Sequence, residues 1–205
     1  MKIDFDQVSY VLGQSIGGDF KRQGFEIDSK IFMDSFIAAF NGEKPKMPVG
    51  EMKHIMQNFQ SAMQDKKQAE QMNAGNKNIV AGEKFLAENS KKEGVNVTES
   101  GLQYKVITEG NGKKPAVTDT VETHYEGKTL EGKIFDSSYK RGKTTSFPLN
   151  GVIKGWTEAL QLMTEGSKYE LYIPAELAYG ATGGGAIEPY STLIFKVELI
   201  AIKKG

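Results

Sequence analysis

The sequence predicts an α+β protein in which an all-α N-terminal part and a long helix precede an antiparallel sheet wrapped around one short helix. Two observations carry this prediction. Apolar residues recur at helical spacing in the first half of the chain, whereas beyond Gly94 they alternate with polar residues, as in strands. We therefore expect a helical domain over residues 1–47, a connecting helix over 48–93 and a sheet domain over 94–205.

The composition is typical of a soluble globular protein, with 39% apolar and 25% charged residues in a chain of 205. The 26 basic and 26 acidic residues balance, so no charge excess indicates nucleic acid as a partner. No run of about 18 apolar residues indicates a membrane span. The chain has no cysteine, which excludes disulfides and thiolate chemistry. No apolar leader follows Met1, so we expect a cytoplasmic protein; removal of a signal peptide would leave a periplasmic or cell-surface location open.

The first helix is expected over residues 5–21, where apolar side chains follow one face. Gly13 and Gly17 lie about one turn apart within it. Because glycine costs roughly 1 kcal/mol in a helix interior, two explanations stay open. Either the pair allows another helix to approach closely, or the helix is frayed or broken there.

A second helix is expected after Asp28, a good N-cap residue, and it ends at Asn41. Its phenylalanine stripe, formed by Phe32, Phe36 and Phe40, follows the spacing i, i+4 and i+8. Two short helices cannot bury such a stripe well by themselves. We therefore expect this stripe, together with the two glycines of the first helix, to form the interface of a twofold-symmetric homodimer.

A third, long helix is expected over about 49–92, because this stretch contains no proline. Its first part is amphipathic and its middle is polar all round, which favours a helix that crosses solvent between two domains. Gly75 and Gly82 are the expected bend points. A disordered linker is the alternative.

Four strands are expected in the second half, over residues 102–106, 121–125, 169–173 and 193–199. Glutamate-glycine pairs between the apolar runs are interpreted as turns, among them Glu126-Gly127, Glu131-Gly132 and Glu165-Gly166. One short helix is expected over 157–163. An antiparallel sheet that covers such a helix is a common α+β arrangement.

Several kinds of chemistry have no support in the sequence. His54 and His124 lie in different halves of the chain, so neither a histidine zinc cluster nor a Ser-His-Asp site is expected. The Gly-Lys-Thr strings at Gly127 and Gly142 lack the glycine five residues earlier that a phosphate-binding loop requires. We therefore expect neither a metal nor a cofactor.

The stretch Gly151-Val152-Ile153-Lys154-Gly155-Trp156 contains the sole tryptophan, between a proline-containing strand and the short helix. A tight turn into a helix can leave a backbone N–H free beside the indole ring, and this pairing suits a pocket for an extended peptide. A buried structural tryptophan is the alternative. Tyr125, residues 135–138 and residues 177–180 strengthen the prediction of a pocket.

With these residues assembled, residues 100–203 resemble the FKBP-type peptidyl-prolyl cis-trans isomerases. The resemblance is carried, in order, by the strings Val121-Glu122-Thr123-His124-Tyr125, Gly132-Lys133-Ile134-Phe135-Asp136-Ser137-Ser138, Val152-Ile153-Lys154-Gly155-Trp156 and Ala178-Tyr179-Gly180. The whole chain also resembles the bacterial two-domain group that includes the macrophage infectivity potentiator, through residues 84–89 and 100–107.

This resemblance implies an FKBP-like fold for the sheet domain and a rotamase that isomerises X-Pro bonds (EC 5.2.1.8). It also implies a homodimer with a chaperone-like role in protein folding, whose partners are unfolded or partly folded proline-containing polypeptides. Binding of a macrolide such as rapamycin is a further implication. The alternative is a peptide-binding chaperone or macrolide-binding module with little catalysis.

The resemblance also assigns an apolar pocket. Its walls would be Tyr125, Phe135 and Phe195, its floor Trp156, and its edge Val152 and Ile153. No acid, base or nucleophile is needed, because an apolar pocket can remove solvent from the prolyl amide and favour its twisted form. We therefore expect catalysis by desolvation and twisting.

Polar groups of this pocket follow from the same resemblance. The Ile153 N–H and the Tyr179 hydroxyl would donate hydrogen bonds to the substrate, and Asp136, beside Arg141, would be the pocket carboxylate. A surface ion pair is the alternative for Asp136 and Arg141.

The loop after the tyrosine would also contact substrate, through Ala186 and Ile187. Three features depart from the family pattern. Thr145 replaces an aromatic residue of many members, Glu188 replaces a frequent proline, and the loop has Gly184-Gly185-Ala186 where some members have His-Pro and Ile. These departures leave macrolide affinity and substrate preference open.

Overall fold

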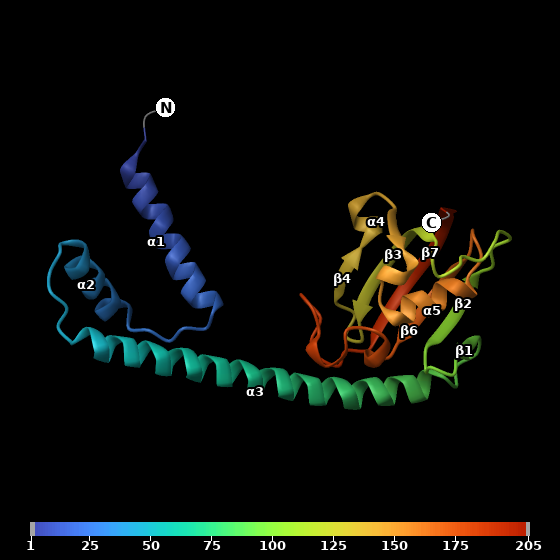
Figure 1. The fold of residues 1–205 in the computed structure, drawn as a ribbon, viewed down its shortest axis with the longest axis horizontal. Coiled ribbons are helices and arrows are strands. Elements are labelled where there is room, and N and C mark those ends of the chain that lie inside the picture. The colour runs from blue at the N-terminus through green and yellow to red at the C-terminus, as the bar shows by residue number, and fades with distance from the viewer. Residues whose placement is uncertain (1–2, 204–205) are drawn as a thin grey trace. The chain divides into compact units, whose positions relative to one another are not determined.

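The structure, a computed structural model, describes residues 3–203 and divides the chain into two compact units, with the boundary between Ser61 and Ala62. The long helix α3 (Val49–Asn89) contributes to both units, and all seven strands belong to the second (Figure 1). None of the helices within residues 3–203 has the length and apolarity needed to cross a membrane.

The first unit begins with α1 (Phe5–Arg22), which is capped by the Asp4 carboxylate. The helix continues without a break through Gly13 and Gly17, so the frayed or broken helix considered from the sequence is not formed. Helix α2 (Ser29–Phe40) starts at Asp28, as predicted, because its carboxylate accepts hydrogen bonds from the first free N–H groups of the helix.

An aromatic cluster joins the helices of the first unit. The ring centroids of Phe20 lie 5.5 Å from Phe25 and 5.4 Å from Phe32, and Phe25 lies 5.1 Å from Phe59 of α3. Phe32 therefore has partners within its own unit, and the expectation that the whole phenylalanine stripe lacks one was wrong at this residue. The rest of the stripe differs, since Phe36 is 50% exposed.

Helix α3 does not bend at the two predicted glycines. Gly75 and Gly82 lie within the continuous helix, and both are buried. A β-carbon at Gly75 would lie 3.1 Å from the Tyr190 ring, and one at Gly82 would collide with the Thr192 hydroxyl. These glycines allow close packing, so the prediction of bend points was wrong.

The C-terminal part of α3 packs against the sheet of the second unit. Asn89 is buried, and its side-chain amide donates a 2.9 Å hydrogen bond to Gln103 Oε1 in β2. The amide of Gln103 in turn donates to the Leu86 carbonyl oxygen at 2.9 Å. Phe85 packs on Tyr172, with ring centroids 5.8 Å apart. Because this stretch is a packed, continuous helix, it is not the disordered linker that the sequence left as an alternative.

The second unit contains one antiparallel sheet with the strand order β1-β2-β6-β7-β3-β4, and β5 pairs with β3. Its strands are β1 (Val95–Val97), β2 (Gln103–Thr108), β3 (Thr120–Thr129), β4 (Ile134–Ser137), β5 (Thr145–Pro148), β6 (Lys168–Ile173) and β7 (Leu193–Lys203). All four strands predicted from alternation are present, and β5 is the proline-containing strand expected before Gly151. Strands β1 and β4 were not predicted from alternation, because with three and four residues they are too short for it to show.

One predicted turn is instead part of a strand. Glu126 and Gly127 lie inside β3, paired with β4 on one side and β7 on the other. A β-carbon at Gly127 would lie 2.5 Å from the Phe195 ring and 2.7 Å from the Phe135 ring. The glycine is required here by two aromatic rings that lie against the strand.

Helix α5 (Lys154–Leu162) packs against the curved sheet and begins three residues earlier than predicted (Figure 1). It buries Trp156, Ala159 and Leu160 against apolar residues of β6 and β7. Gly155 lets the helix approach the sheet, because a β-carbon there would lie 2.5 Å from Ile173 Cγ2. The remaining helical segments are α4 (Ser138–Arg141) and three 3-10 turns, η1 (Leu149–Gly151), η2 (Ala175–Leu177) and η3 (Gly180–Thr182).

Candidate active site

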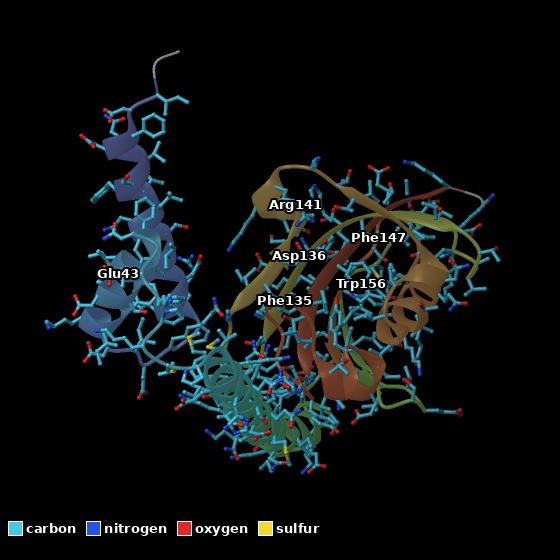
Figure 2. The ribbon with its side chains drawn as sticks, turned by 60° about the vertical axis from the view of Figure 1, so that its left-hand side comes forward. Glu43, Phe135, Asp136, Arg141, Phe147 and Trp156 are labelled. Atoms are coloured by element: carbon cyan, nitrogen blue, oxygen red, sulfur yellow. The ribbon has the colours of Figure 1, made fainter. Side chains whose placement is uncertain are left out.

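Aromatic rings from three strands surround Trp156 at the start of α5. The edge-to-face contacts of its ring have centroid distances of 5.1 Å to Tyr125 on β3, 5.7 Å to Phe147 on β5 and 5.4 Å to Phe195 on β7. Phe135 on β4 packs edge-on against Phe195, at 5.5 Å. The structure thus brings together the predicted floor and walls, and Figure 2 labels Phe135, Phe147 and Trp156 in the second unit.

Phe147 was not predicted as a residue of this site. It is half-buried in β5, packs on the hydrophobic core, and lies 5.7 Å from the Tyr125 ring. The signal that could have found it is the alternation of Thr145 and Phe147 ahead of Pro148, because alternate residues of a strand share one face.

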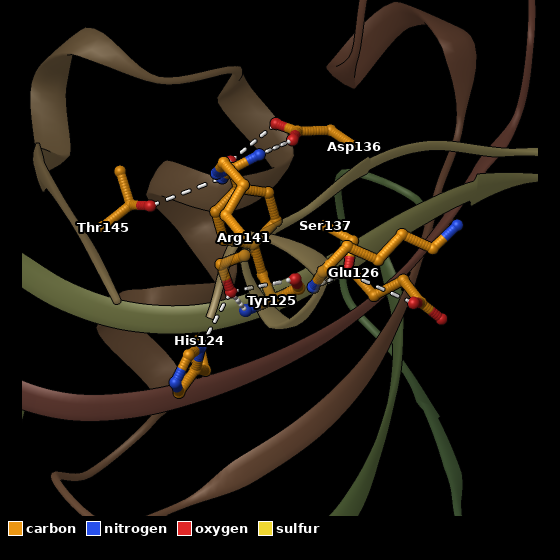
Figure 3. A network of polar contacts seen from close by, with 9 residues as sticks. His124, Tyr125, Glu126, Asp136, Ser137, Arg141 and Thr145 are labelled. Carbon is orange, nitrogen blue, oxygen red and sulfur yellow. Dashed lines mark hydrogen bonds and ion pairs between the residues drawn. The ribbon is translucent and has the colours of Figure 1, made fainter. Parts of the chain in front are cut away.

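A polar network borders the aromatic rings on one side (Figure 3). The Tyr125 hydroxyl donates a 2.6 Å hydrogen bond to Asp136 Oδ2. The Arg141 guanidinium pairs with Asp136 and also donates to the Tyr125 oxygen at 2.8 Å. Thr145 accepts a longer bond from Arg141 at 3.4 Å. Thr145, which stands where many family members have an aromatic residue, therefore joins the network through its hydroxyl group.

Local structure explains why Arg141 reaches back to Asp136. Ser137 ends β4 and caps α4 through a hydrogen bond from the Lys140 N–H. The single turn of α4 then closes at Gly142, whose φ of 70° suits glycine. This turn carries Arg141 over the Tyr125 ring, with its guanidinium carbon 5.5 Å from the ring centroid.

The charges of this network are fixed near neutral pH. Burial by itself would raise the pKa of Asp136, but the hydrogen bonds from Tyr125 and Arg141 outweigh it and lower the pKa below its usual value. For Tyr125, burial and the hydrogen bond to Asp136 raise the pKa. The network therefore consists of a carboxylate, a guanidinium and a protonated phenol.

Two hydrogen-bond donors beside the aromatic rings have no partner within the part of the chain that the structure describes. They are the Ile153 backbone N–H and the buried Trp156 indole N–H. Ile153 is the N-cap residue of α5, so its carbonyl oxygen accepts from Trp156 while its N–H precedes the helix. Val152 and Ile153 are half-buried and pack on the core. The tight turn thus leaves a free N–H near the indole, as the sequence predicts.

The loop after β6 carries the remaining predicted residues. Tyr179 is 40% exposed at the start of η3, and Ile187 is buried in the core cluster that includes Trp156. Ala186 is exposed and lines a cavity shared with Asn78 and Lys133. Contacts of Ala186 and Ile187 with substrate stay predictions.

The residues predicted for dimerisation lie on α1 and α2 of the first unit. A β-carbon at Gly13 or Gly17 would have no neighbour within 4 Å. Neither helix has a buried residue, and Phe40 is 83% exposed. Within residues 3–203, the parts of these helices that carry Gly13, Gly17 and Phe40 are therefore uncovered, whereas Phe20 and Phe32 pack on each other.

Comparison with known proteins identifies the class. Residues 5–106 match the family described as the domain amino terminal to FKBP-type peptidyl-prolyl isomerase, and residues 111–200 match the FKBP-type peptidyl-prolyl cis-trans isomerase family. The chain therefore belongs to the FKBP-type peptidyl-prolyl cis-trans isomerases that carry this N-terminal domain, and it is an enzyme of that type.

Several relatives are similar over nearly the whole chain. The outer membrane protein MIP of Legionella longbeachae is 42% identical over 98% of this chain and 87% of its own length. The FKBP-type 22 kDa peptidyl-prolyl cis-trans isomerase of Escherichia coli K12 is 46% identical over 96% of this chain and 94% of its own length. The crystal structure of FkpA from Escherichia coli matches with a TM-score of 0.75 at 35% identity, covering 100% of this chain and 99% of that chain. The expected cytoplasmic location gains no support, since one relative is named an outer membrane protein.

Proposed function

We propose that the enzyme isomerises X-Pro bonds of folding proteins by removing solvent from the prolyl amide and stabilising its twisted form among the aromatic rings. The observation that carries this proposal is the edge-to-face packing of Tyr125, Phe147 and Phe195 around Trp156, beside the unpaired Ile153 N–H. These rings give an apolar site with few hydrogen-bonding groups, and the N–H gives a fixed donor.

The energetic requirement is moderate. A prolyl amide rotates unaided behind a barrier of about 18–20 kcal/mol, because resonance keeps it planar and dipolar. A rise from about 0.01 to about 1000 turnovers per second requires roughly 7 kcal/mol. An apolar site disfavours the dipolar planar form, and each well-placed hydrogen bond to the twisted form contributes further.

Particular groups have separate roles in this proposal. The Ile153 N–H donates to the carbonyl oxygen of the substrate, and the Tyr179 hydroxyl donates a second hydrogen bond. The polar network of Asp136 and Arg141 fixes the Tyr125 ring as a wall, since it holds the tyrosine hydroxyl from two sides. No step transfers a proton.

A substitution at Ile153 tests this proposal. Ile153 has φ −60° and Val152 has φ −102° and ψ 175°, so proline fits the backbone at position 153. Ile153→Pro therefore removes the N–H and leaves the backbone in place, whereas Ile153→Ala shortens the side chain and keeps the N–H.

We expect Ile153→Pro to lower kcat/KM for a short X-Pro peptide by about tenfold more than Ile153→Ala does, as for the loss of one hydrogen bond in the transition state. A proline-limited refolding assay should likewise show a lower rate with Ile153→Pro than with Ile153→Ala. Equal rates for the two folded variants would contradict a role for this N–H.

The first unit supports a second part of the proposal, a homodimer with a chain-binding, chaperone-like role. Its helices expose large apolar side chains, among them Phe5 at 72%, Tyr10 at 70% and Phe40 at 83%. Exposed apolar surface of this kind favours association with another apolar surface. Two joined active sites would act on one unfolded chain with a raised effective concentration.

Two further points are proposals of the same kind. A macrolide such as rapamycin would occupy the aromatic pocket and compete with X-Pro peptides. We also propose that the protein works in the periplasm or at the cell surface, because one relative is named an outer membrane protein. Inhibition of peptide isomerisation by rapamycin would test the first point, and fractionation of the source cells the second.

A further inference from the structure

A stripe of mostly small and polar residues on α3 faces the sheet of the second unit. Gly75, Asn78, Gly82, Phe85 and Asn89 follow the alternating three- and four-residue spacing of one helix face. Three of them, seven residues apart, are buried, although most residues between them are exposed. This spacing shows that one face of the helix is in continuous contact with the rest of the unit.

The N-terminal half of this stripe contacts the end of the loop that follows Tyr179. The Asn78 side-chain amide donates to the Pro189 carbonyl oxygen at 2.9 Å and to Glu188 Oε2 at 3.2 Å. At Gly75 the helix backbone lies close to the Tyr190 ring, since a β-carbon there would be 3.1 Å from Tyr190 Cδ2. A larger residue at position 75 would displace this ring.

Tyr190 has an unusual backbone conformation. Among residues 3–203 it is the one non-glycine residue with a positive φ, at 55°. This conformation costs about 1–2 kcal/mol for an L-residue, so its surroundings must hold it. Its N–H donates a 2.8 Å hydrogen bond to the Gly180 carbonyl oxygen, and its ring lies against α3.

The contacts continue from this point to Tyr179. Gly180, the acceptor for Tyr190, is the next residue after Tyr179. Gly184 and Ile187 exchange two hydrogen bonds of 2.9 Å, which close the loop on itself. Gly184 also lies close to the Tyr179 ring, because a β-carbon there would be 3.3 Å from Tyr179 Cδ1. Contacts of the loop therefore lead from α3 to Gly180, the residue after Tyr179, and to the Tyr179 ring itself.

We propose that Gly75 and Asn78 of α3 are positioning residues for isomerisation: they hold residues 188–190, and through them fix the loop that places the Tyr179 hydroxyl at the pocket. The proposal rests on the hydrogen-bonding role of Tyr179 proposed above. It gives the helix a part in catalysis without any contact with the substrate.

The first test replaces Gly75 by leucine in the full chain. Leucine favours a helix more than glycine, so the helix itself is not weakened, whereas the seat of the Tyr190 ring is lost. Gly50→Leu is the matched control, because Gly50 lies in the same helix and an added β-carbon there has no neighbour within 4 Å.

We expect Gly75→Leu to lower kcat/KM for a short X-Pro peptide by about tenfold and to speed hydrogen exchange of the Tyr190 amide, while Gly50→Leu changes neither. The slowing should be absent from a double variant in which Tyr179→Phe has already removed the hydroxyl. If the two slowing factors multiply in the double variant, α3 does not act through Tyr179 and the proposal is overturned. If Tyr179→Phe alone has no effect, the proposed role of Tyr179 fails first, and this inference with it.

A second variant guards against misfolding. Asn78→Asp keeps the size of the side chain but replaces its donor amide by a carboxylate, which also repels Glu188. Adding Glu188→Gln should restore a hydrogen bond between positions 78 and 188 and recover part of the lost activity, while the bond to the Pro189 carbonyl oxygen stays lost. Unchanged activity in the Asn78→Asp single variant, or no recovery in the double variant, would overturn the proposal.

Discussion

The two units of the chain differ in how far they bury their apolar side chains. Residues 62–205 enclose a core in which Leu160, Leu171 and Val197 are fully buried. In the first unit neither α1 nor α2 has a buried residue, although both carry phenylalanine and isoleucine at helical spacing. The second unit thus buries its apolar side chains within one chain, whereas the first leaves large apolar side chains exposed. This difference separates the part that performs catalysis from the part proposed to join two copies.

The largest effect is expected from a charge placed on the uncovered surface. Phe36→Glu should weaken the dimer by roughly a hundredfold to a thousandfold, because an unpaired charge in an apolar interface costs several kcal/mol. Peptide isomerisation should be unchanged and assisted refolding much reduced. Ser35→Glu, on the neighbouring face of α2, is the control. If sedimentation finds the unaltered protein monomeric at micromolar concentration, the proposal that the first unit joins two copies of the chain is wrong.

The next effect is expected inside the second unit. Asp136→Ala leaves the Arg141 guanidinium and the Tyr125 hydroxyl without their shared acceptor, so kcat/KM should fall by about tenfold to a hundredfold. Asp136→Asn, which keeps an acceptor oxygen, should fall less. Sedimentation of both variants should match the unaltered protein, since the network lies far along the sequence from α1 and α2. Full activity of Asp136→Ala would indicate that Asp136 and Arg141 form a surface ion pair with no part in catalysis.

Shortening the chain tests where the catalytic unit begins. A fragment of residues 98–205 should still isomerise a short X-Pro peptide, but about tenfold more slowly than a fragment of residues 62–205, because it lacks the loop contacts of α3. It should also lose about 1–3 kcal/mol of unfolding free energy from the buried Gln103 amide that Asn89 and Leu86 no longer pair. Peptide kinetics and urea unfolding measure the two effects. Equal kinetics and stability would place α3 outside the catalytic unit.

The smallest effect is expected from pH. The pKa of Asp136 is lowered, so the stability contributed by its carboxylate is present above about pH 3.9 and is lost as the pH falls through the lower folded value. The pKa of Tyr125 is raised above its usual value of about 10. Neither group titrates near neutrality, and kcat/KM should vary little from about pH 6 to 9. His124→Ala should change the rate by about twofold at most. A bell-shaped profile that disappears in His124→Ala would instead indicate proton transfer.

Much of the second unit could be predicted from short stretches of sequence. Alternation placed the strands that carry Tyr125 and Phe195, and the stretch around Trp156 indicated a tight turn with a free N–H, which the family resemblance assigned to Ile153. Asp28 and Asn41 bounded α2. Each of these features depends on interactions within a few residues, such as capping or the period of an element, so the local sequence contains the information.

The tertiary structure decided what the sequence left ambiguous, above all at glycines. Gly75 and Gly82 were expected to bend α3 and Gly127 to form a turn, yet each makes room for a side chain distant in sequence: Tyr190, Thr192 or Phe195. A glycine has no side chain whose pattern could distinguish a bend from a close contact, so its role depends on what packs against it. The same holds for Phe147 and for the positive φ of Tyr190, which neighbouring elements fix only after the sheet and α3 have come together.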